Sequence, residues 1–260
     1  MEQENKPTVR IIVATHKAYN MPDDSIYLPL LVGASQNKAD WNGARDNEGD
    51  NISSKNPNYC ELTGMYWAWK NVSADYIGLV HYRRHFANNK WWKKKSERII
   101  TGPELIPYLQ DNDILLPKKR HYWIETNYSQ YAHAHHKEDL DLTRQVIQNR
   151  EPQYLGAFDH IMKKTAGHRF NMMIMKKDKF DQYCEWMFGI LFDLESILDF
   201  SSYSTNDRRV FGFVGERLLD VWLEANSMTY KNRPYVFLEH QNWIKKGFAF
   251  LGRKARAGGK

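Results

Sequence analysis

The chain has 260 residues, of which 42% are hydrophobic and 26% are charged, and its formal net charge is +6. Length and composition are typical of one globular α/β domain that buries most of its apolar surface. The positive charge favours an anionic partner, such as a nucleotide, a nucleic acid or an anionic membrane surface. The only cysteines, Cys60 and Cys184, exclude a disulfide framework and a cysteine-based zinc pattern, which is typical of a reducing cytoplasm.

No targeting or membrane-spanning segment stands out in the sequence. The first residues are polar, and no apolar run reaches the ~18 residues that cross a bilayer. We therefore expect a cytoplasmic protein. The sequence also lacks a phosphate-binding Walker loop, a Rossmann glycine fingerprint and a serine elbow, which argues against P-loop NTPases, simple dehydrogenases and α/β-hydrolases.

The first predicted strand spans residues 9–14 and ends in the polar side chains of Thr15, His16 and Lys17. A loop over residues 19–29 and a short strand at 30–32 follow. Residues 33–55 are rich in Asn, Asp, Gly and Ser and predict a long irregular loop, a kind of segment that is usually functional or mobile. We expect ligand contacts from Asp50 and Asn51 in this loop.

Residues 58–71 carry apolar side chains at helical spacing and predict a helix that leads into the next strand. Glu61 lies in its first turn. A carboxylate at this position stabilises the helix dipole, which is one interpretation of Glu61. A functional role is the other.

The segment at residues 75–86 predicts the central strand and the heart of the site. An apolar run at 76–80 ends abruptly in His81, Tyr82, Arg83 and Arg84. Open α/β sheets bind ligands at the carboxyl ends of their strands, and arginine forks suit phosphate. We therefore expect an anionic, sugar-bearing or nucleotide ligand here. Structural ion pairs at a strand end are the alternative role for the two arginines.

A further strand, at residues 113–116, ends in a basic run, and the segment 121–141 that follows is rich in histidine and tyrosine. Helical spacing predicts that His135 and Asp139 share one helix face. Such a pair can bind a divalent metal, contact a substrate or simply form structural hydrogen bonds.

The remaining elements are helices around 143–147, 154–162, 176–198 and 207–223 and a strand at 170–175. The helix at 207–223 presents Glu216 near the site. Two segments combine tryptophan with lysine, residues 91–95 and the tail 243–260. Either can lie on an anionic bilayer, although a solvated loop and a frayed terminus are the simpler interpretations.

Several of these stretches, in this order, resemble a bacterial family known as domain of unknown function 4422, whose members look like capsular and exopolysaccharide glycosyltransferases. The resemblance covers roughly residues 9–240. It rests on residues 15–17, 49–63, 81–84, Tyr131, His135, His136, 138–141, 170–172 and 215–218.

The resemblance implies an α/β fold with a GT-A-like, Rossmann-type mixed sheet flanked by helices, as a single domain over residues 1–242 followed by the tail. It also implies transfer of galactofuranose from UDP-galactofuranose to a hydroxyl of a lipid-linked surface-polysaccharide acceptor, with inversion. The base that deprotonates this hydroxyl is then Glu216 or Asp139. Donor contacts are expected from Thr15, His16, Lys17, Asp50, Asn51, His81, Tyr82, Arg83 and Arg84, and acceptor contacts from Tyr131, His135, His136, Glu138 and Asn171.

Cofactor use follows from one departure from common GT-A enzymes. Those enzymes hold a divalent metal with an Asp-x-Asp motif at the end of a central strand. Here the residues from His81 to Arg84 stand at that place, so we expect arginine to stabilise the diphosphate and no metal ligands, with Mn²⁺ or Mg²⁺ left open as a cofactor.

Two other classes of function remain open. A carbohydrate- or nucleotide-binding protein without catalysis would use the same aromatic and arginine side chains. A nucleic-acid binder would explain the charge, but the usual motifs of such proteins do not occur, so we expect no nucleic-acid partner. Turnover of a sugar nucleotide separates the first alternative from an enzyme.

Overall fold

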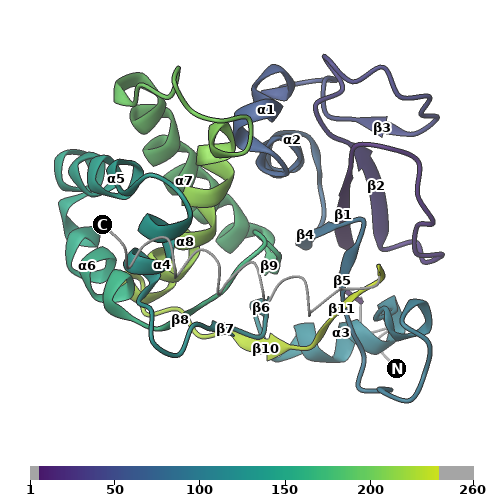
Figure 1. Cartoon of the computed structure of the whole chain (residues 1–260). Helices are drawn as coiled ribbons and strands as arrows, with labels where there is room; N and C mark the ends of the chain where they lie inside the picture. The colour runs from purple at the N-terminus through teal and green to yellow at the C-terminus, as the bar shows by residue number, and fades with distance from the viewer. Residues whose placement is uncertain (1–5, 240–260) are drawn as a thin grey trace.

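The computed structural model of the chain describes residues 6–239, and one mixed β-sheet forms its centre (Figure 1). The main path of the sheet has the order β10-β6-β9-β4-β1-β2-β3. β1 pairs in parallel with β2 and β4, whereas β9 is antiparallel to β4 and β6. The strands are β1 (Val9–Thr15), β2 (Tyr27–Leu31), β3 (Ala44–Arg45), β4 (Tyr76–His81), β5 (Arg84–Phe86), β6 (Ile114–Pro117), β7 (Arg120–His121), β8 (Ala166–Gly167), β9 (Met173–Lys176), β10 (Lys231–Arg233) and β11 (Tyr235–Phe237).

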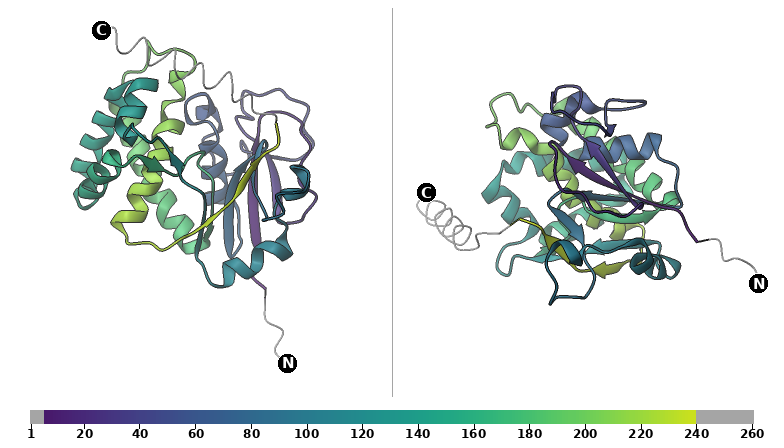
Figure 2. Two further views of the ribbon diagram at one scale, coloured as in Figure 1. Left: turned by 60° about the horizontal axis from the view of Figure 1, so that its bottom comes forward. Right: turned by 90° about the vertical axis from the view of Figure 1, so that its right-hand side faces the viewer.

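Helices cover both faces of this sheet (Figures 1 and 2). On one face α2, α7 and α8 pack on the sheet through a core that includes Leu79, Met173, Met187 and Leu218, and α4, α5 and α6 lie beyond them. On the other face α3 packs on the sheet through Leu105. The helices are α1 (Asn56–Tyr59), α2 (Leu62–Asn71), α3 (Gly102–Gln110), α4 (Asn127–Ala134), α5 (Lys137–Arg150), α6 (Leu155–Lys163), α7 (Lys177–Ile197) and α8 (Val210–Ala225).

Local sequence explains why these elements form. β1 and β4 are apolar through nearly their whole length, as expected for strands that are covered on both faces. α7 carries apolar side chains at helical spacing on its buried side. α3 begins with a capping box between Thr101 and Glu104 and has a proline in its first turn. The predicted fold class, a mixed sheet flanked by helices, is confirmed.

The helix predicted over residues 58–71 is interrupted. It divides into α1 and α2 at Cys60, whose φ of 53° is incompatible with a continuous helix. α8 packs closely against the break, because a Cβ on Gly212 would lie 3.3 Å from the Cβ of Cys60. Glu61 therefore stands just before α2 and directly after a kink.

The predicted helix face shared by His135 and Asp139 is wrong. α4 ends at Ala134 and α5 begins at Lys137, and His135 between them has an extended backbone. The loop predicted over residues 19–29 is also too long, because β2 already begins at Tyr27.

Across residues 6–239, no helix is long and apolar enough to cross a membrane. The predicted basic aromatic tail, residues 243–260, lies outside the described residues.

Candidate active site

Strand direction assembles the site at one edge of the sheet. β1 and β4 end at this edge, and antiparallel β9 begins there, so the segment 168–172 meets the residues that follow β4. Two neighbouring cavities of about 320 and 340 Å³ open at the edge. We name the first the arginine cavity and the second the strand-end cavity. Both are lined by Cys60, Glu61, His81, Arg83 and Arg209.

The strand-end cavity lies beside the end of β1. Thr15 and His16 line it together with Ala14, Val32 and Asn56. The Thr15 hydroxyl donates to the carbonyl oxygen of Lys17 at 2.6 Å and so folds the chain back after the strand. Thr15 and His16, two of the residues expected to contact the donor, thus line a cavity.

Four other residues expected to contact the donor lie outside both cavities. Tyr82 is buried, and its ring supports the guanidinium of Arg83 at 5.0 Å and the ammonium of Lys17 at 5.7 Å. The Asp50 carboxylate accepts from the Tyr66 hydroxyl, and Asn51 accepts from the backbone of Ser53. The loop around Asp50 and Asn51 therefore binds to its own neighbours.

His81 carries no charge in this setting. Burial, followed by the charges of Arg84 and Arg83, lowers its pKa to about 3. A neutral imidazole can donate or accept a hydrogen bond without adding to the positive charge of the cavity walls.

The arginine cavity has an excess of positive charge. Within residues 6–239, Arg83 pairs with Glu239 and Arg217 pairs with Glu216, whereas four further arginines of the wall form no ion pair with a carboxylate. An anionic ligand would supply the missing countercharge. The four are Arg84, Arg120, Arg169 and Arg209.

Aromatic and sulfur groups hold two of these cations. The Arg84 guanidinium lies 4.3 Å from the ring centre of Phe170 and 5.1 Å from that of Phe237. Arg209 donates from Nε to the Cys60 sulfur at 3.1 Å. Burial raises the pKa of Cys60 to about 11, so the thiol stays protonated and supplies no negative charge to Arg209.

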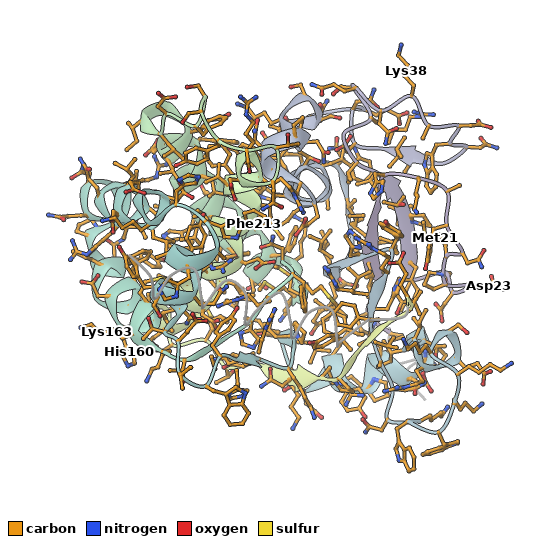
Figure 3. The ribbon with its side chains drawn as sticks, in the orientation of Figure 1. Met21, Asp23, Lys38, His160, Lys163 and Phe213 are labelled. Carbon is orange, nitrogen blue, oxygen red and sulfur yellow. The ribbon has the colours of Figure 1, made fainter. Side chains whose placement is uncertain are left out.

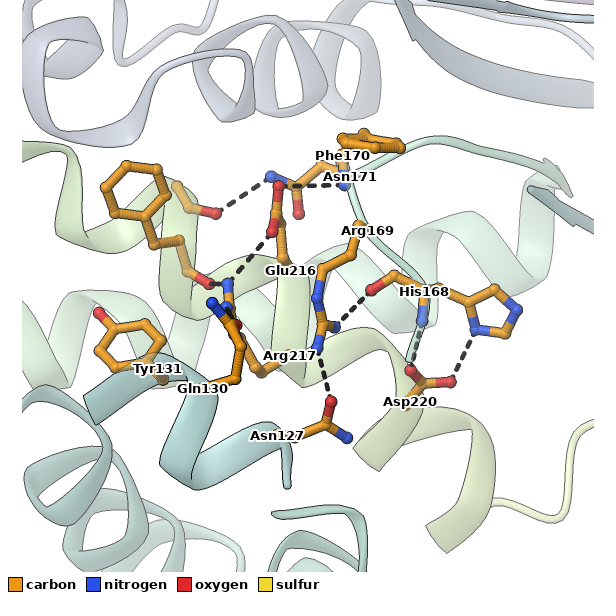
Figure 4. Close-up of polar contacts among 12 residues, drawn as sticks. Asn127, Gln130, Tyr131, His168, Arg169, Phe170, Asn171, Glu216, Arg217 and Asp220 are labelled. Atoms are coloured by element: carbon orange, nitrogen blue, oxygen red, sulfur yellow. Dashed lines mark hydrogen bonds and ion pairs between the residues drawn. The ribbon is translucent and has the colours of Figure 1, made fainter. Parts of the chain in front are cut away.

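Two arginines form the buried floor (Figure 4). Arg169 is 5% exposed and donates to the Tyr122 hydroxyl, the His168 carbonyl and the Asn127 side chain, each at 2.6 Å. Arg217 donates to Gln130 at 2.9 Å and to the Phe213 carbonyl at 2.8 Å. Neutral acceptors thus fix the direction of Arg169 without neutralising it.

Phe213 lies between the sheet and the outer helices, whereas His160 and Lys163 of α6 lie at the periphery (Figure 3).

Glu216, one of the two predicted bases, lines the arginine cavity. Its Oε1 accepts from the backbone N–H of Phe170 at 3.0 Å, and its Oε2 pairs with Arg217 at 3.1 Å (Figure 4). The carboxylate is therefore anchored through both oxygens.

Asp139, the other predicted base, lies outside both cavities and is 1% exposed. Its two oxygens accept from the hydroxyls of Tyr131 and Tyr203, each at 2.7 Å. Tyr131, an expected acceptor contact, is itself fully buried. These bonds tie α4 and α5 to the segment before α8.

Of three other residues expected to contact the acceptor, one lines the arginine cavity and two do not. His135 lines the arginine cavity, where its ring stacks on Phe213 and its Nδ1 lies 3.1 Å from Asp207. His136 stacks on Tyr203 with ring centres 3.9 Å apart, and Glu138 is exposed in the first turn of α5. Of these three residues only His135 reaches the site.

Asn171, also expected to contact the acceptor, is buried outside both cavities and contacts Glu61. Its Nδ2 donates to Glu61 Oε1 at 2.9 Å and to the Gly212 carbonyl at 3.2 Å.

In the described part of the chain, no three His, Cys, Asp or Glu side chains converge to hold a metal ion.

The sequence interpretation missed much of the cavity wall. Arg169 precedes a predicted strand and would have been assigned to the site if the antiparallel direction of β9 had been known. The other missed residues lie in the basic run after residues 113–116, in the segment 121–141 and in the helix predicted at 207–223, where nothing local marks which side chains face the cavity. They are Arg120, Tyr122, Gln130, Arg209, Phe213 and Arg217.

Comparison with known proteins places this geometry in a family. A solved structure that resembles the chain is described as apo WbbM, a bifunctional glycosyltransferase, with a TM-score of 0.83 and 30% sequence identity. The match covers 90% of this chain and 46% of that chain, so this chain spans about half of its relative. No curated protein matches. Residues 10–227 match the family model described as domain of unknown function DUF4422, and the chain therefore belongs to the DUF4422 family.

Proposed function

We propose that this protein is a glycosyltransferase that moves a sugar from a nucleotide donor to a hydroxyl of a glycan acceptor. The observation that carries the proposal is the arginine cavity at the carboxyl edge of the sheet, where four arginines form no ion pair within residues 6–239 and can bind an anion. The likeness to a structure described as a bifunctional glycosyltransferase supports the same class of reaction.

We propose that the donor is a UDP-sugar that bridges the two cavities. Its nucleoside occupies the strand-end cavity beside Thr15 and His16, and its diphosphate lies against Arg83 and Arg84. Arginine forks bind phosphate oxygens in pairs and stabilise the charge that develops on the leaving diphosphate. Bound divalent metal is then dispensable.

The finer assignments extend this proposal. The donor sugar is galactofuranose, the acceptor is a lipid-linked surface polysaccharide and the reaction inverts the anomeric centre. The acceptor enters the arginine cavity on the side of Gln130 and His135. The reaction needs a carboxylate as base, and Glu216 lines this cavity whereas Asp139 is enclosed by two tyrosines. Asp139 is therefore no longer our candidate.

A screen of UDP release from a panel of sugar nucleotides tests the proposal, with both ring forms of UDP-galactose included. We expect release from one donor in the presence of a glycan acceptor, and unchanged turnover after EDTA treatment. Thermal stabilisation by UDP without turnover of any donor would instead favour a non-catalytic nucleotide-binding protein. Loss of turnover with EDTA would refute the role of arginine in place of metal.

A further inference from the structure

The site contains a second carboxylate, Glu61, in a more central place than Glu216. Glu61 lines both the strand-end cavity and the arginine cavity, whereas Glu216 lines only the latter. Because the proposed donor bridges the two cavities and the proposed acceptor enters the arginine cavity, the donor passes through the place where the cavities join. Glu61 stands at this junction.

Strained backbone surrounds Glu61, both at the residue before it and in the segment that carries its hydrogen-bond donor. Cys60, the residue before it, has a φ of 53°. Asn171, which donates to its carboxylate, has a φ of 50°, and Phe170, whose N–H holds Glu216, has a φ of 77°. Such conformations cost about 1–3 kcal/mol each in a residue other than glycine and cluster at functional sites. Three of them converge here on the two carboxylates.

The two carboxylates differ in how many of their oxygens already accept from another group of the protein. Glu216 is held through one oxygen by Phe170 and through the other by Arg217. Glu61 receives a hydrogen bond from Asn171 on Oε1, and no side-chain donor of residues 6–239 reaches its Oε2. That oxygen can accept a hydrogen bond from a substrate hydroxyl.

Charge and burial also favour Glu61 as a proton acceptor. Burial, and to a smaller extent the negative charge of Glu216, raise the pKa of Glu61, while Asn171 and Arg209 act against this rise. A carboxylate with a raised pKa is a stronger base, provided that it remains ionised at the working pH. Both oxygens of Glu216 already have partners, the backbone N–H of Phe170 and the guanidinium of Arg217, which leaves them less available to a substrate hydroxyl.

We propose that Glu61 is the general base of sugar transfer and that Glu216 is a positioning residue that orders Phe170 and Arg217 around it. This inference rests on the proposed glycosyltransferase function. The acceptor oxygen forms a bond to the anomeric carbon, and its proton passes to Glu61. The bond from the anomeric carbon to the β-phosphate oxygen breaks, and UDP leaves with the electron pair.

The experiment compares Glu61→Gln, Glu216→Gln and Glu185→Gln, a control at an exposed position of α7. The readouts are UDP release from the responsive UDP-sugar and the thermal shift caused by UDP alone. We expect Glu61→Gln to lower kcat by about 100-fold or more, with an unchanged UDP shift. Glu216→Gln should lower kcat less than Glu61→Gln does and should raise KM more. Glu61→Asp, which keeps the carboxylate, should be more active than Glu61→Gln.

The pH profile provides the readout that a purely structural role would not change. The wild-type kcat/KM should fall on the acid side as Glu61 takes up a proton, and this limb should be absent from the residual activity of Glu61→Gln. Turnover of Glu61→Gln within tenfold of wild type would overturn the assignment of the base alone. Wild-type protein that turns over no sugar nucleotide would overturn the proposed function, and the base with it.

If Glu61→Gln does not fold, the comparison of Glu61→Asp with wild type tests whether Glu61 is the general base. A folded Glu61→Asp that retains the acid limb at lower kcat supports the proposal. Full kcat in that variant, with a side chain shorter by one methylene, would contradict it, because the carboxylate could then no longer reach the same hydroxyl.

Discussion

At the scale of single residues, the groups that donate to a carboxylate decide what it can do. Glu61 keeps one oxygen without a side-chain donor of the described residues, whereas both oxygens of Asp139 accept from tyrosine hydroxyls. Burial raises the pKa of Asp139, and the two hydroxyls act against this rise. Asp139 is placed to join elements and not to meet a substrate.

We therefore expect Asp139→Ala to lower stability more than chemistry. The substitution leaves the hydroxyls of Tyr131 and Tyr203 without their acceptor, which costs on the order of 3 kcal/mol in the free energy of unfolding. Urea denaturation measures this loss, with exposed Glu138→Gln as the control. A variant of native stability that had lost its turnover would show that Asp139 acts in catalysis after all.

Asp220 supports the arginine cavity from behind. Burial raises its pKa, but hydrogen bonds from His168 and the charge of Lys119 outweigh this effect and hold the pKa at about 2. His168 directly precedes Arg169, so the carboxylate fixes the backbone that positions this cation. The contact is stabilising only while Asp220 is ionised.

Stability should consequently fall in acid. The folded-state pKa of Asp220 lies below the ordinary 3.8, so its contribution is complete above pH 4 and is lost as the pH falls towards 2. The shift corresponds to roughly 2 kcal/mol. Denaturation at several pH values should show this loss in wild type and in Asp40→Asn, an exposed control. Asp220→Asn should be less stable at pH 7 and should not show this part of the acid dependence.

At the scale of elements, the apolar strands and the long helices were predictable, whereas the short strands β3, β5, β7, β8, β10 and β11 and the breaks between elements were not. The apolar runs of β1, β4 and β9 and the helical spacing of α7 are local patterns. The break at Cys60 depends on tertiary contact, because α8 packs against it through Gly212. The helix predicted across residues 135–139 also breaks at a residue with tertiary contacts, His135, whose ring stacks on Phe213 and whose Nδ1 lies 3.1 Å from Asp207.

The turn before β9 provides a test at this scale. Asn171 adopts a left-handed conformation and also holds Glu61. Asn171→Gly keeps the backbone conformation and removes the side-chain bond, whereas Asn171→Ala also introduces strain of about 1 kcal/mol. Both variants should lose turnover to a similar extent, and the alanine variant should melt lower in a thermal scan. Native turnover in the glycine variant would mean that Glu61 needs no support from Asn171.

At the scale of the whole molecule, the net charge predicted an anionic partner but not where it binds. The arginines of the cavity come from residues 83–84, 120, 169, 209 and 217, segments that only the fold brings together. Local sequence assigned Arg83 and Arg84 because they directly follow an apolar strand. Arg120 also stands in a basic run that follows a predicted strand, whereas Arg169, Arg209 and Arg217 do not directly follow one.

A second feature of the whole molecule lies on its surface. Trp91 and Trp92 are 77% and 67% exposed in the lysine-rich loop between β5 and α3, and Trp123 is 86% exposed after β7. Tryptophans beside lysines suit the interface of an anionic bilayer, where the rings enter the headgroup region and the cations meet phosphate. A lipid-linked acceptor would be presented at such a surface.

We therefore expect the protein to bind vesicles that contain anionic lipid, and the double substitution Trp91→Ala/Trp92→Ala to weaken this binding by about tenfold or more, because each ring loses apolar burial. Co-sedimentation with vesicles measures the effect, and Ile197→Ala, at a residue that is 50% exposed at the end of α7, is the matched control. Binding should also weaken with salt, because attraction between lysines and anionic headgroups is screened. Equal binding by the double variant and the control would show that Trp91 and Trp92 do not contribute to membrane binding. Any salt dependence of vesicle binding would then come from other parts of the chain.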